Sequence, residues 1–135
     1  MFKTVLYPVD RSREAQEAAI VVADIVKRYD SRLVILSVLE KPDEEDAMRN
    51  PMISQEAVEG LLKGAQAVFA QHGITAETIE REGKPAFVIC DVADELNANL
   101  IVMGSRGLGL TEDGASESIT TLVINLSPCP VLVVP

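Results

Sequence analysis

The chain has 135 residues, the usual length of one domain, so we predict a single domain over residues 1–135. Its net charge of -9 repels phosphate groups, which argues against general nucleic-acid binding and against docking on anionic lipid. No apolar run reaches the roughly 18 residues that a membrane-spanning helix needs, and a composition without Trp predicts a core of Val, Ile, Leu and Ala.

Strand and helix patterns alternate from the start of the chain. A short apolar run predicts a strand over 4–9, and an almost purely aliphatic run predicts a second, interior strand over 33–38. Ser12 is placed to cap a helix between them. The apolar residues of that helix recur at offsets of three and four, which gives it one buried face: Ala15, Ala18, Ala19, Val22 and Val26.

Residues 40–53 interrupt this alternation. They contain two prolines and several acidic residues without any periodicity, so we predict a flexible surface loop over 40–53. A lid, a partner-binding segment and a solvated loop without a further role are all consistent with this composition.

A second helix is predicted to begin at Ser54 and to end at Gly73. Residues 74–79 alternate apolar and polar side chains, as an edge strand does. The core-facing residues of the helix are expected to be Val58, Leu61, Leu62, Ala65, Val68 and Phe69.

The last part of the chain repeats the alternation. Pro85 suits the first turn of a third helix, and strands are predicted over 100–103 and 131–134. A glycine-rich loop leads to a fourth helix with Ser116 as a candidate cap. The core-facing residues are expected to be Ile89, Val92, Ala93 and Leu96 in the third helix, and Ile119, Leu122, Val123 and Leu126 in the fourth.

Five strands with four intervening helices indicate an α/β fold, a five-stranded parallel doubly wound sheet with helices on both faces. Such sheets bind ligands outside the carboxyl ends of the strands, where the winding reverses. If the strand order is 3-2-1-4-5, this reversal lies between the first and fourth strands. Asp10 and Gly104, which end those two strands, would then meet at one site.

The glycine-rich loop after the fourth strand can turn backbone N–H groups toward an anion, although a tight turn also needs glycine. A phosphate-binding P-loop is rejected, because Ala115 stands where that motif requires Lys. Asp10 can be a nucleophile, a metal ligand or a hydrogen-bond acceptor, or it can simply cap the first helix.

No catalytic or metal site is predicted. His72 is the single histidine, and its position at a helix end separates it from both candidate loops. Cys90 and Cys129 form neither a metal cluster nor a CxxC motif, and two isolated thiols are typical of a reducing compartment. The chain opens directly into a strand pattern without a signal peptide, so we expect a cytoplasmic protein.

Three stretches resemble the universal stress protein family over the whole chain. They are residues 5–10 (Val-Leu-Tyr-Pro-Val-Asp), residues 101–109 (Ile-Val-Met-Gly-Ser-Arg-Gly-Leu-Gly) and residues 127–134 (Ser-Pro-Cys-Pro-Val-Leu-Val-Val). The resemblance implies the sheet order 3-2-1-4-5 and a stress-linked regulatory role without a defined reaction, so no enzyme is expected.

Many members of that family bind ATP through a Gly-x2-Gly-x9-Gly-[Ser/Thr] motif. In this chain the third glycine is replaced by Glu117, whose charge disfavours ATP. We therefore expect weak or absent ATP binding. The alternative is an ATP- or AMP-responsive switch that hydrolyses the nucleotide slowly at most. By resemblance, the candidate nucleotide-binding residues are Asp10, Val38, Gly104, Gly107, Ser118, Ile119 and Thr120.

The family also commonly forms two-fold dimers through its last strand. An apolar strand at a sheet edge invites pairing, which agrees with this resemblance. We therefore expect a homodimer formed through Val131, Leu132, Val133 and Val134.

Overall fold

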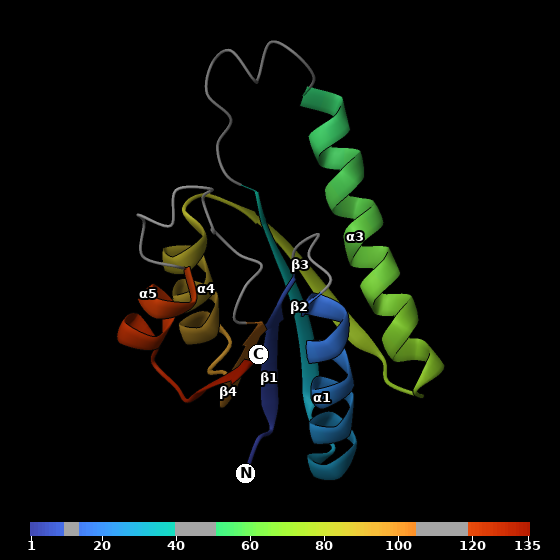
Figure 1. Ribbon diagram of the computed structural model, residues 1–135, viewed down its shortest axis with the longest axis vertical. Helices are drawn as coiled ribbons and strands as arrows, with labels where there is room; N and C mark the ends of the chain where they lie inside the picture. The colour runs from blue at the N-terminus through green and yellow to red at the C-terminus, as the bar shows by residue number, and fades with distance from the viewer. Residues whose placement is uncertain (10–13, 40–50, 105–118) are drawn as a thin grey trace.

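The computed structural model describes residues 1–9, 14–39, 51–104 and 119–135 (Figure 1). Strands and helices alternate along the chain, as predicted. The elements are β1 (Thr4–Pro8), α1 (Glu14–Tyr29), β2 (Arg32–Leu39), α3 (Pro51–Gln71), β3 (Ala76–Glu82), α4 (Pro85–Glu95), β4 (Leu100–Gly104), α5 (Ile119–Leu126) and β5 (Val131–Val134).

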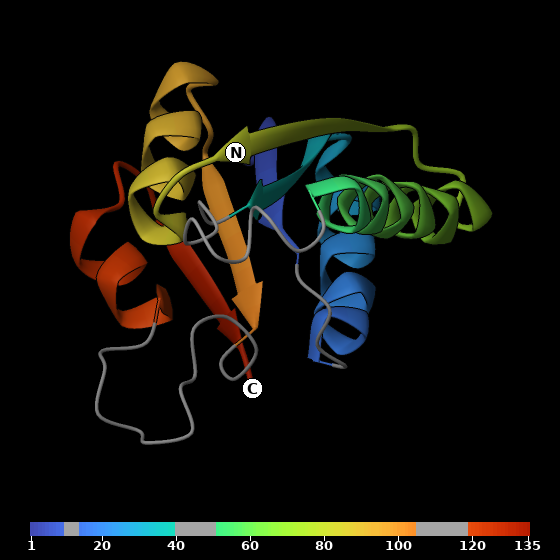
Figure 2. The ribbon, with the colours of Figure 1, turned by 90° about the horizontal axis from the view of Figure 1, so that it is seen from above.

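The five strands form one parallel sheet in the order β3-β2-β1-β4-β5. Figure 2 shows α1 and α3 on one face of the sheet and α4 and α5 on the other. The predicted doubly wound α/β fold and its strand order are therefore confirmed. In this order β1 is central, because it pairs with β2 on one side and with β4 on the other.

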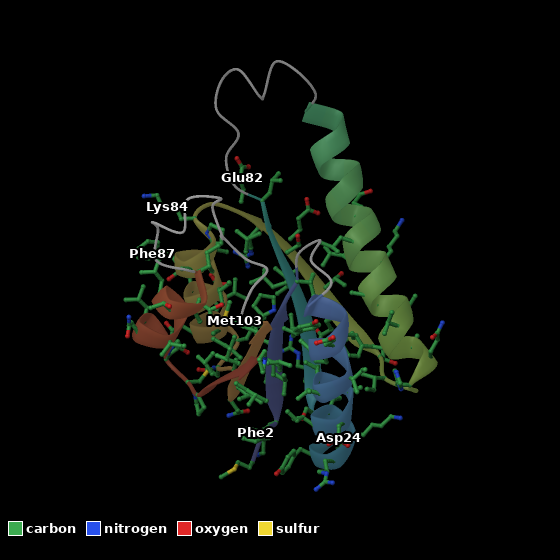
Figure 3. The ribbon with its side chains drawn as sticks, viewed as in Figure 1. Phe2, Asp24, Glu82, Lys84, Phe87 and Met103 are labelled. Carbon is green, nitrogen blue, oxygen red and sulfur yellow. The ribbon has the colours of Figure 1, made fainter. Side chains whose placement is uncertain are left out.

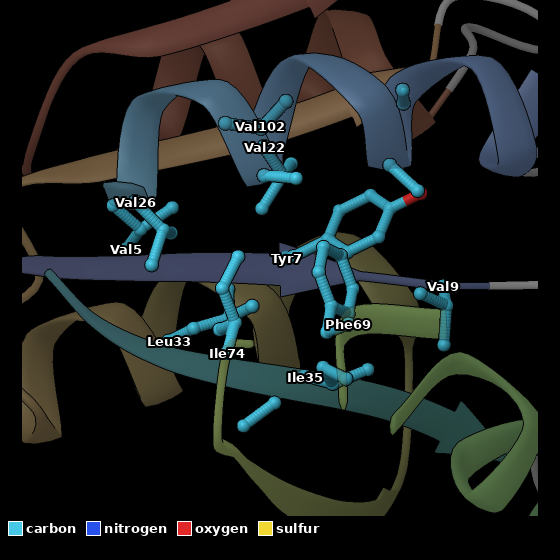
Figure 4. Packing of buried hydrophobic residues seen from close by; sticks show 14 of the residues in the cluster. Val5, Tyr7, Val9, Val22, Val26, Leu33, Ile35, Phe69, Ile74 and Val102 are labelled. Atoms are coloured by element: carbon cyan, nitrogen blue, oxygen red, sulfur yellow. The ribbon is translucent and has the colours of Figure 1, made fainter. Parts of the chain in front are cut away.

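The first core lies between the sheet and helices α1 and α3 (Figure 4). Val5, Tyr7 and Val9 face this side together, because successive side chains of an extended segment alternate between faces. The Tyr7 ring meets Phe69 of α3 edge to face, with ring centroids 5.9 Å apart. Burying each such side chain stabilises the fold by about 1.5–3 kcal/mol, so this core anchors the strand that ends at the expected site.

The second core lies between the sheet and helices α4 and α5. Leu6 of β1 and Met103 of β4 face this side and are fully buried. The buried helical residues include most of the predicted stripes: Ile89, Val92 and Ala93 from α4, and Ile119 and Val123 from α5.

The structure corrects the predicted boundary of the 40–53 loop. Helix α3 begins at Pro51 instead of Ser54, so residues 51–53 are helical. Proline suits the first helical position, because its fixed φ matches the helix and the missing N–H would have no helical partner there. Residues 40–50 lie outside the described residues, and their predicted flexibility stays a prediction.

Two further predictions were wrong in detail. Strand β3 spans Ala76–Glu82 instead of 74–79, because its backbone pairs with β2 as far as the Leu39–Glu82 register, beyond the apolar pattern. Val68 and Leu126 are 43% and 47% exposed, so the buried stripes of their helices are narrower than the sequence spacing suggested. Helix α5 packs against α4 and the edge strand β5, and its Ile124 is also exposed.

Helix α3 ends at Gln71, and Gly73, the predicted stop signal, follows it with a φ of 77°. The N–H of Gly73 donates to the Ala70 carbonyl at 3.0 Å, and the N–H of Ile74 donates to the Phe69 carbonyl at 2.9 Å. This pair of bonds is the Schellman motif, and Ile74 and Phe69 both belong to the first core.

The central pair of strands is fixed at its start by Asn99. The Thr4 N–H donates to Asn99 Oδ1 at 2.9 Å, and the Asn99 N–H donates to the Thr4 carbonyl at 2.8 Å. These bonds set the register of β1 against β4, and this register fixes where the carboxyl ends of the two strands lie relative to each other. Within the described ranges, no helix combines the length and the apolar character that crossing a membrane requires.

Candidate functional site

The winding of the sheet reverses between β1 and β4, which are hydrogen-bonded neighbours. Helix α1 follows β1 and packs on one face, whereas α5 follows β4 and packs on the other. The helices that follow β1 and β4 along the chain therefore lie on opposite faces of the sheet. Ligands of doubly wound sheets bind at this position.

The carboxyl end of β1 is held by its neighbour β2. The Val9 N–H donates to the Leu36 carbonyl at 2.9 Å, which continues the strand pairing one residue beyond β1. The Val9 side chain is buried in the first core. Asp10, the candidate that follows it, lies outside the described residues.

The carboxyl end of β4 is joined directly to α5. The Thr120 hydroxyl donates to the Gly104 carbonyl oxygen at 3.1 Å, across 16 positions of the chain. Thr120 is only 6% exposed, and the bond itself is partly buried. It brings together two of the residues that the resemblance assigned to a nucleotide site.

Two other candidates lie on the same side of the sheet. Ile119 is buried in the second core, and Val38 of β2 packs against that core from its edge. Val38, Gly104, Ile119 and Thr120 therefore all border the layer between the sheet and helices α4 and α5. Gly107, Ser118 and the substituted position Glu117 lie outside the described residues.

The sequence reasoning did not single out the turn between β3 and α4, which also lies at this end of the sheet. The Gly83 N–H donates to the Leu39 carbonyl at 2.9 Å, at the end of β2. Gly83 has a φ of 147°, and a Cβ there would stand 2.9 Å from Val88 Cγ2. Only glycine fits this conformation and this space. The available signal was a glycine two residues before a helix-starting proline.

Charged side chains accompany this turn. Figure 3 shows Glu82 and Lys84 at one end of the molecule and Phe2 and Asp24 at the other. Lys84 is exposed at the N-cap position of α4 and makes no side-chain capping bond. Glu82 and Lys84 therefore place one charge of each sign at the end of the sheet where the candidate site lies.

The remaining reactive side chains lie elsewhere in the fold. Cys90 belongs to the second core and Cys129 packs against it, both as free thiols. Burial raises the pKa of both thiols, and for Cys90 the charge of Asp91 raises it further. Both thiols therefore stay protonated at neutral pH, which makes them poor nucleophiles. His72 is exposed where α3 ends, on the chain leading into the start of β3.

The described part of the site is a rigid frame. The Val9 and Gly83 N–H groups and the Gly104 carbonyl are hydrogen-bonded within the protein, beside apolar side chains such as Val38 and Ile119. Across the described ranges, no group of three or more His, Cys, Asp or Glu residues could hold a metal ion.

Comparisons with known proteins agree on one family. The model of the "Universal stress protein family" matches residues 1–135. The universal stress protein Sll1654 of Synechocystis is 64% identical over 136 residues, which cover 100% of this chain and 87% of the relative.

Solved structures show the same architecture. The universal stress protein UspA from Lactobacillus plantarum matches with a TM-score of 0.83 and 26% identity, over 99% of this chain and 98% of that one. A universal stress protein solved in complex with cAMP matches with a TM-score of 0.80 and 24% identity, over 99% and 97% of the two chains.

Proposed function

The chain belongs to the universal stress protein family, and from that premise we propose that it is a non-catalytic regulatory dimer of the stress response. In this proposal the carboxyl edge of the sheet binds an adenine mononucleotide in preference to ATP. The observation that carries the proposal is the gathering of Val38, Gly104, Ile119 and Thr120 at one end and on one side of the sheet.

The preference against ATP follows from charge. Glu117 occupies the motif position at which the family's ATP-binding members have glycine, and Glu112 and Asp113 precede it in the same loop. A carboxylate about 5 Å from a phosphate charge is repelled by about 3 kcal/mol at an effective dielectric constant near 20. Screening lowers this to about 1–3 kcal/mol, or roughly one to two decades of affinity.

A mononucleotide carries fewer phosphate charges and meets less of this repulsion. The solved cAMP complex supports the view that this fold can accommodate an adenine mononucleotide. The turn between β3 and α4 does not change this balance, because the exposed Lys84 lies beside the exposed Glu82. We therefore expect this chain to bind AMP more tightly than ATP.

The absence of catalysis is part of the proposal. General acid–base chemistry needs a titratable side chain at the reacting group. Among the described residues, the single histidine lies at the end of α3, and both thiols have raised pKa values inside or against the second core. These positions favour a protein that binds a ligand and does not transform it.

The dimer is proposed through β5. This strand forms one edge of the sheet, and Leu132 within it is 37% exposed. The adjoining helix α5 exposes 53% of Ile124 and 47% of Leu126. Pairing two β5 edges in a two-fold dimer would cover apolar surface that the single chain leaves in contact with water.

We also propose a cytoplasmic location, where a reducing environment suits the free Cys90 and Cys129.

A direct test first identifies any nucleotide that remains bound through purification and then measures ATP hydrolysis in solution. Mass spectrometry of the purified protein should find AMP or another adenine mononucleotide more often than ATP. Incubation of the protein with ATP should release no more ADP than buffer does. ADP released with steady turnover would show an enzyme, and failure of every adenine nucleotide to bind would refute the proposed ligand.

A further inference from the structure

We propose that Gly83 is a positioning residue of the nucleotide site, because its missing side chain lets α4 begin directly against the carboxyl end of β2. This close approach builds an apolar wall from Val38 of β2 and Val88 of α4, and the base of a bound mononucleotide packs on that wall. The inference rests on the proposed function, because the wall has a role only if an adenine nucleotide binds at this end of the sheet.

The wall borders the candidate site because β2 is longer than its neighbour β1. Pro8, the last residue of β1, pairs with Leu36, so Val38 lies two positions beyond the residue that pairs with the end of β1. Figure 1 shows β2 continuing past β1 toward this end of the molecule. The Val38 side chain faces the second core, on the side of the sheet where Thr120 bonds to Gly104. It therefore borders the region above the ends of β1 and β4.

The turn between β3 and α4 brings a second apolar side chain to the same place. The Gly83 N–H donates to the Leu39 carbonyl at 2.9 Å, one residue after Val38. The Val88 N–H donates to the Lys84 carbonyl at 3.0 Å, which makes Val88 part of the start of α4. Val38 and Val88 are both half-buried and both pack against the second core. Each therefore keeps part of its apolar surface exposed near the end of β2.

Glycine makes this approach possible in two ways. Gly83 has a φ of 147°, a conformation that L side chains rarely adopt. A Cβ there would stand 2.9 Å from Val88 Cγ2, closer than real Cβ contacts. Because a valine in a helix has one strongly preferred rotamer, Val88 cannot easily turn away, and the start of α4 would have to move. A side chain at position 83 would therefore displace Val88 and change the shape of the wall.

An apolar wall suits the base of a nucleotide. The face of an adenine ring packs well on aliphatic side chains, whereas phosphate oxygens need hydrogen-bond donors or positive charge. The side chains of Val38 and Val88 supply neither donors nor charge. The wall should therefore distinguish a ligand that carries a base from one that consists of sugar and phosphate alone.

The test uses three variants and two probes. Gly83→Ala adds the side chain that the turn excludes, and Val88→Ala shortens the wall without straining the turn. Gly73→Ala is the matched control: Gly73 also has a positive φ, but it leads into the amino end of β3, and a Cβ there would meet nothing within 4 Å. AMP and ribose 5-phosphate are titrated into each protein, and NMR follows both the affinity and the valine methyl signals.

We expect Gly83→Ala and Val88→Ala each to bind AMP about fivefold more weakly, which corresponds to the loss of roughly one methylene-sized apolar contact. Gly73→Ala should lose stability and keep the AMP affinity of the wild type. In the wild type, AMP should shift the methyl signals of Val38 and Val88 through the ring current of its base. Ribose 5-phosphate has no aromatic ring and should shift them much less.

Three results would overturn the positioning role. Methyl signals of Val38 and Val88 that AMP leaves unchanged would show that the base lies elsewhere. Full AMP affinity in Val88→Ala would show that the wall does not contribute, and this variant decides the matter even if Gly83→Ala fails to fold. An equal loss of AMP affinity in Gly73→Ala and Gly83→Ala would trace the effect to stability alone.

Failure of the proposed function looks different. If the wild type itself binds neither AMP nor ATP, the proposed function fails, and the positioning inference falls with it. If the wild type binds AMP and only the methyl signals or the variants differ from those expected, the proposed function stands and this inference alone is wrong.

Discussion

Hydrogen bonds from single side chains fix the register of neighbouring strands. Asn99 exchanges two hydrogen bonds with Thr4 at the start of the central strand pair. Arg32 of β2 bonds Glu77 of β3 through two nitrogens, with Nη2 to Oε1 at 2.9 Å. The Arg32 guanidinium holds the pKa of the Glu77 carboxyl below its ordinary value, mainly through this hydrogen bonding. Both connections lie at the amino end of the sheet, away from the candidate site.

The Arg32–Glu77 pair leads to a prediction about pH. The pKa of Glu77 is lower in the folded protein than in the unfolded chain. The pair therefore stabilises the protein at pH values above the ordinary carboxyl pKa, and this stabilisation is lost as the pH falls through the pKa of the folded state. Glu77→Gln should therefore show a smaller loss of stability below about pH 4.5 than the wild type. The effect should be small, because both side chains are about half exposed.

Chemical unfolding at several pH values measures this effect. Glu80→Gln, at another exposed acidic position of β3, is the control and should follow the wild type. A Glu77→Gln profile parallel to that of the wild type would mean that the pair does not contribute.

At the scale of elements, the ends of the helices decide where the chain turns toward the next strand. Glycine occupies the positions with the largest positive φ, Gly73 after α3 and Gly83 before α4, whereas Asp30 and Asn97 adopt a positive φ of 51° and 52°. Glycine is not required inside α3, where Gly60 and Gly64 lie on exposed helix and an added Cβ would meet nothing within 4 Å. The same residue type thus has opposite effects on stability at these positions.

This contrast predicts opposite signs for one substitution. Gly64→Ala should stabilise the protein by about 0.5–1 kcal/mol, because alanine favours the helix and restricts the unfolded chain. Gly73→Ala should destabilise it by about 1–2 kcal/mol, because an L side chain is strained at a φ of 77°. Denaturant titration of both variants measures the difference. A destabilised Gly64→Ala would show that α3 is packed differently along that face.

At the scale of the whole molecule, the two edges of the sheet differ in character. Strand β3 exposes mainly charged side chains, which discourage pairing with another strand. Strand β5 is Val-Leu-Val-Val, and its residues are partly exposed beside the exposed Ile124 and Leu126 of α5. The chain therefore has one edge suited to solvent and one suited to a partner, which is the basis for proposing a dimer through β5.

The dimer is tested by placing a charge on its proposed interface. Val133→Asp should shift the protein to monomer, since pairing would bring two added carboxylates into an apolar contact. Thr78→Asp places the same charge on the β3 edge and should leave the dimer intact. Light scattering at micromolar concentration gives the mass of each form. A monomeric wild type would exclude the dimer, and a dimeric Val133→Asp would move the interface away from β5.

Local signals were sufficient to locate the strands and helices, whereas the strand order came from the resemblance to the family. Apolar runs located β1, β2, β4 and β5, an alternating pattern located β3, and Gly73 and Pro85 correctly marked a helix end and a helix start. The errors lie where tertiary contacts decide: β3 extends to Glu82 because β2 supplies backbone partners there. For the site, no local pattern reveals the Thr120–Gly104 bond, because its partners meet only after β4 and α5 have packed. The lack of room for a Cβ at Gly83 likewise depends on the position of Val88.

The central claim is that Glu117 makes this chain a poor ATP binder that retains an adenine-nucleotide site. Calorimetric titration of the wild type and of Glu117→Gly with ATP and with AMP tests it most directly. We predict that the wild type binds ATP with a dissociation constant in the high micromolar range or above. Glu117→Gly should increase the affinity for ATP at least about tenfold and the affinity for AMP by less. Tight ATP binding by the wild type, or no gain of ATP affinity in the variant, would contradict this account.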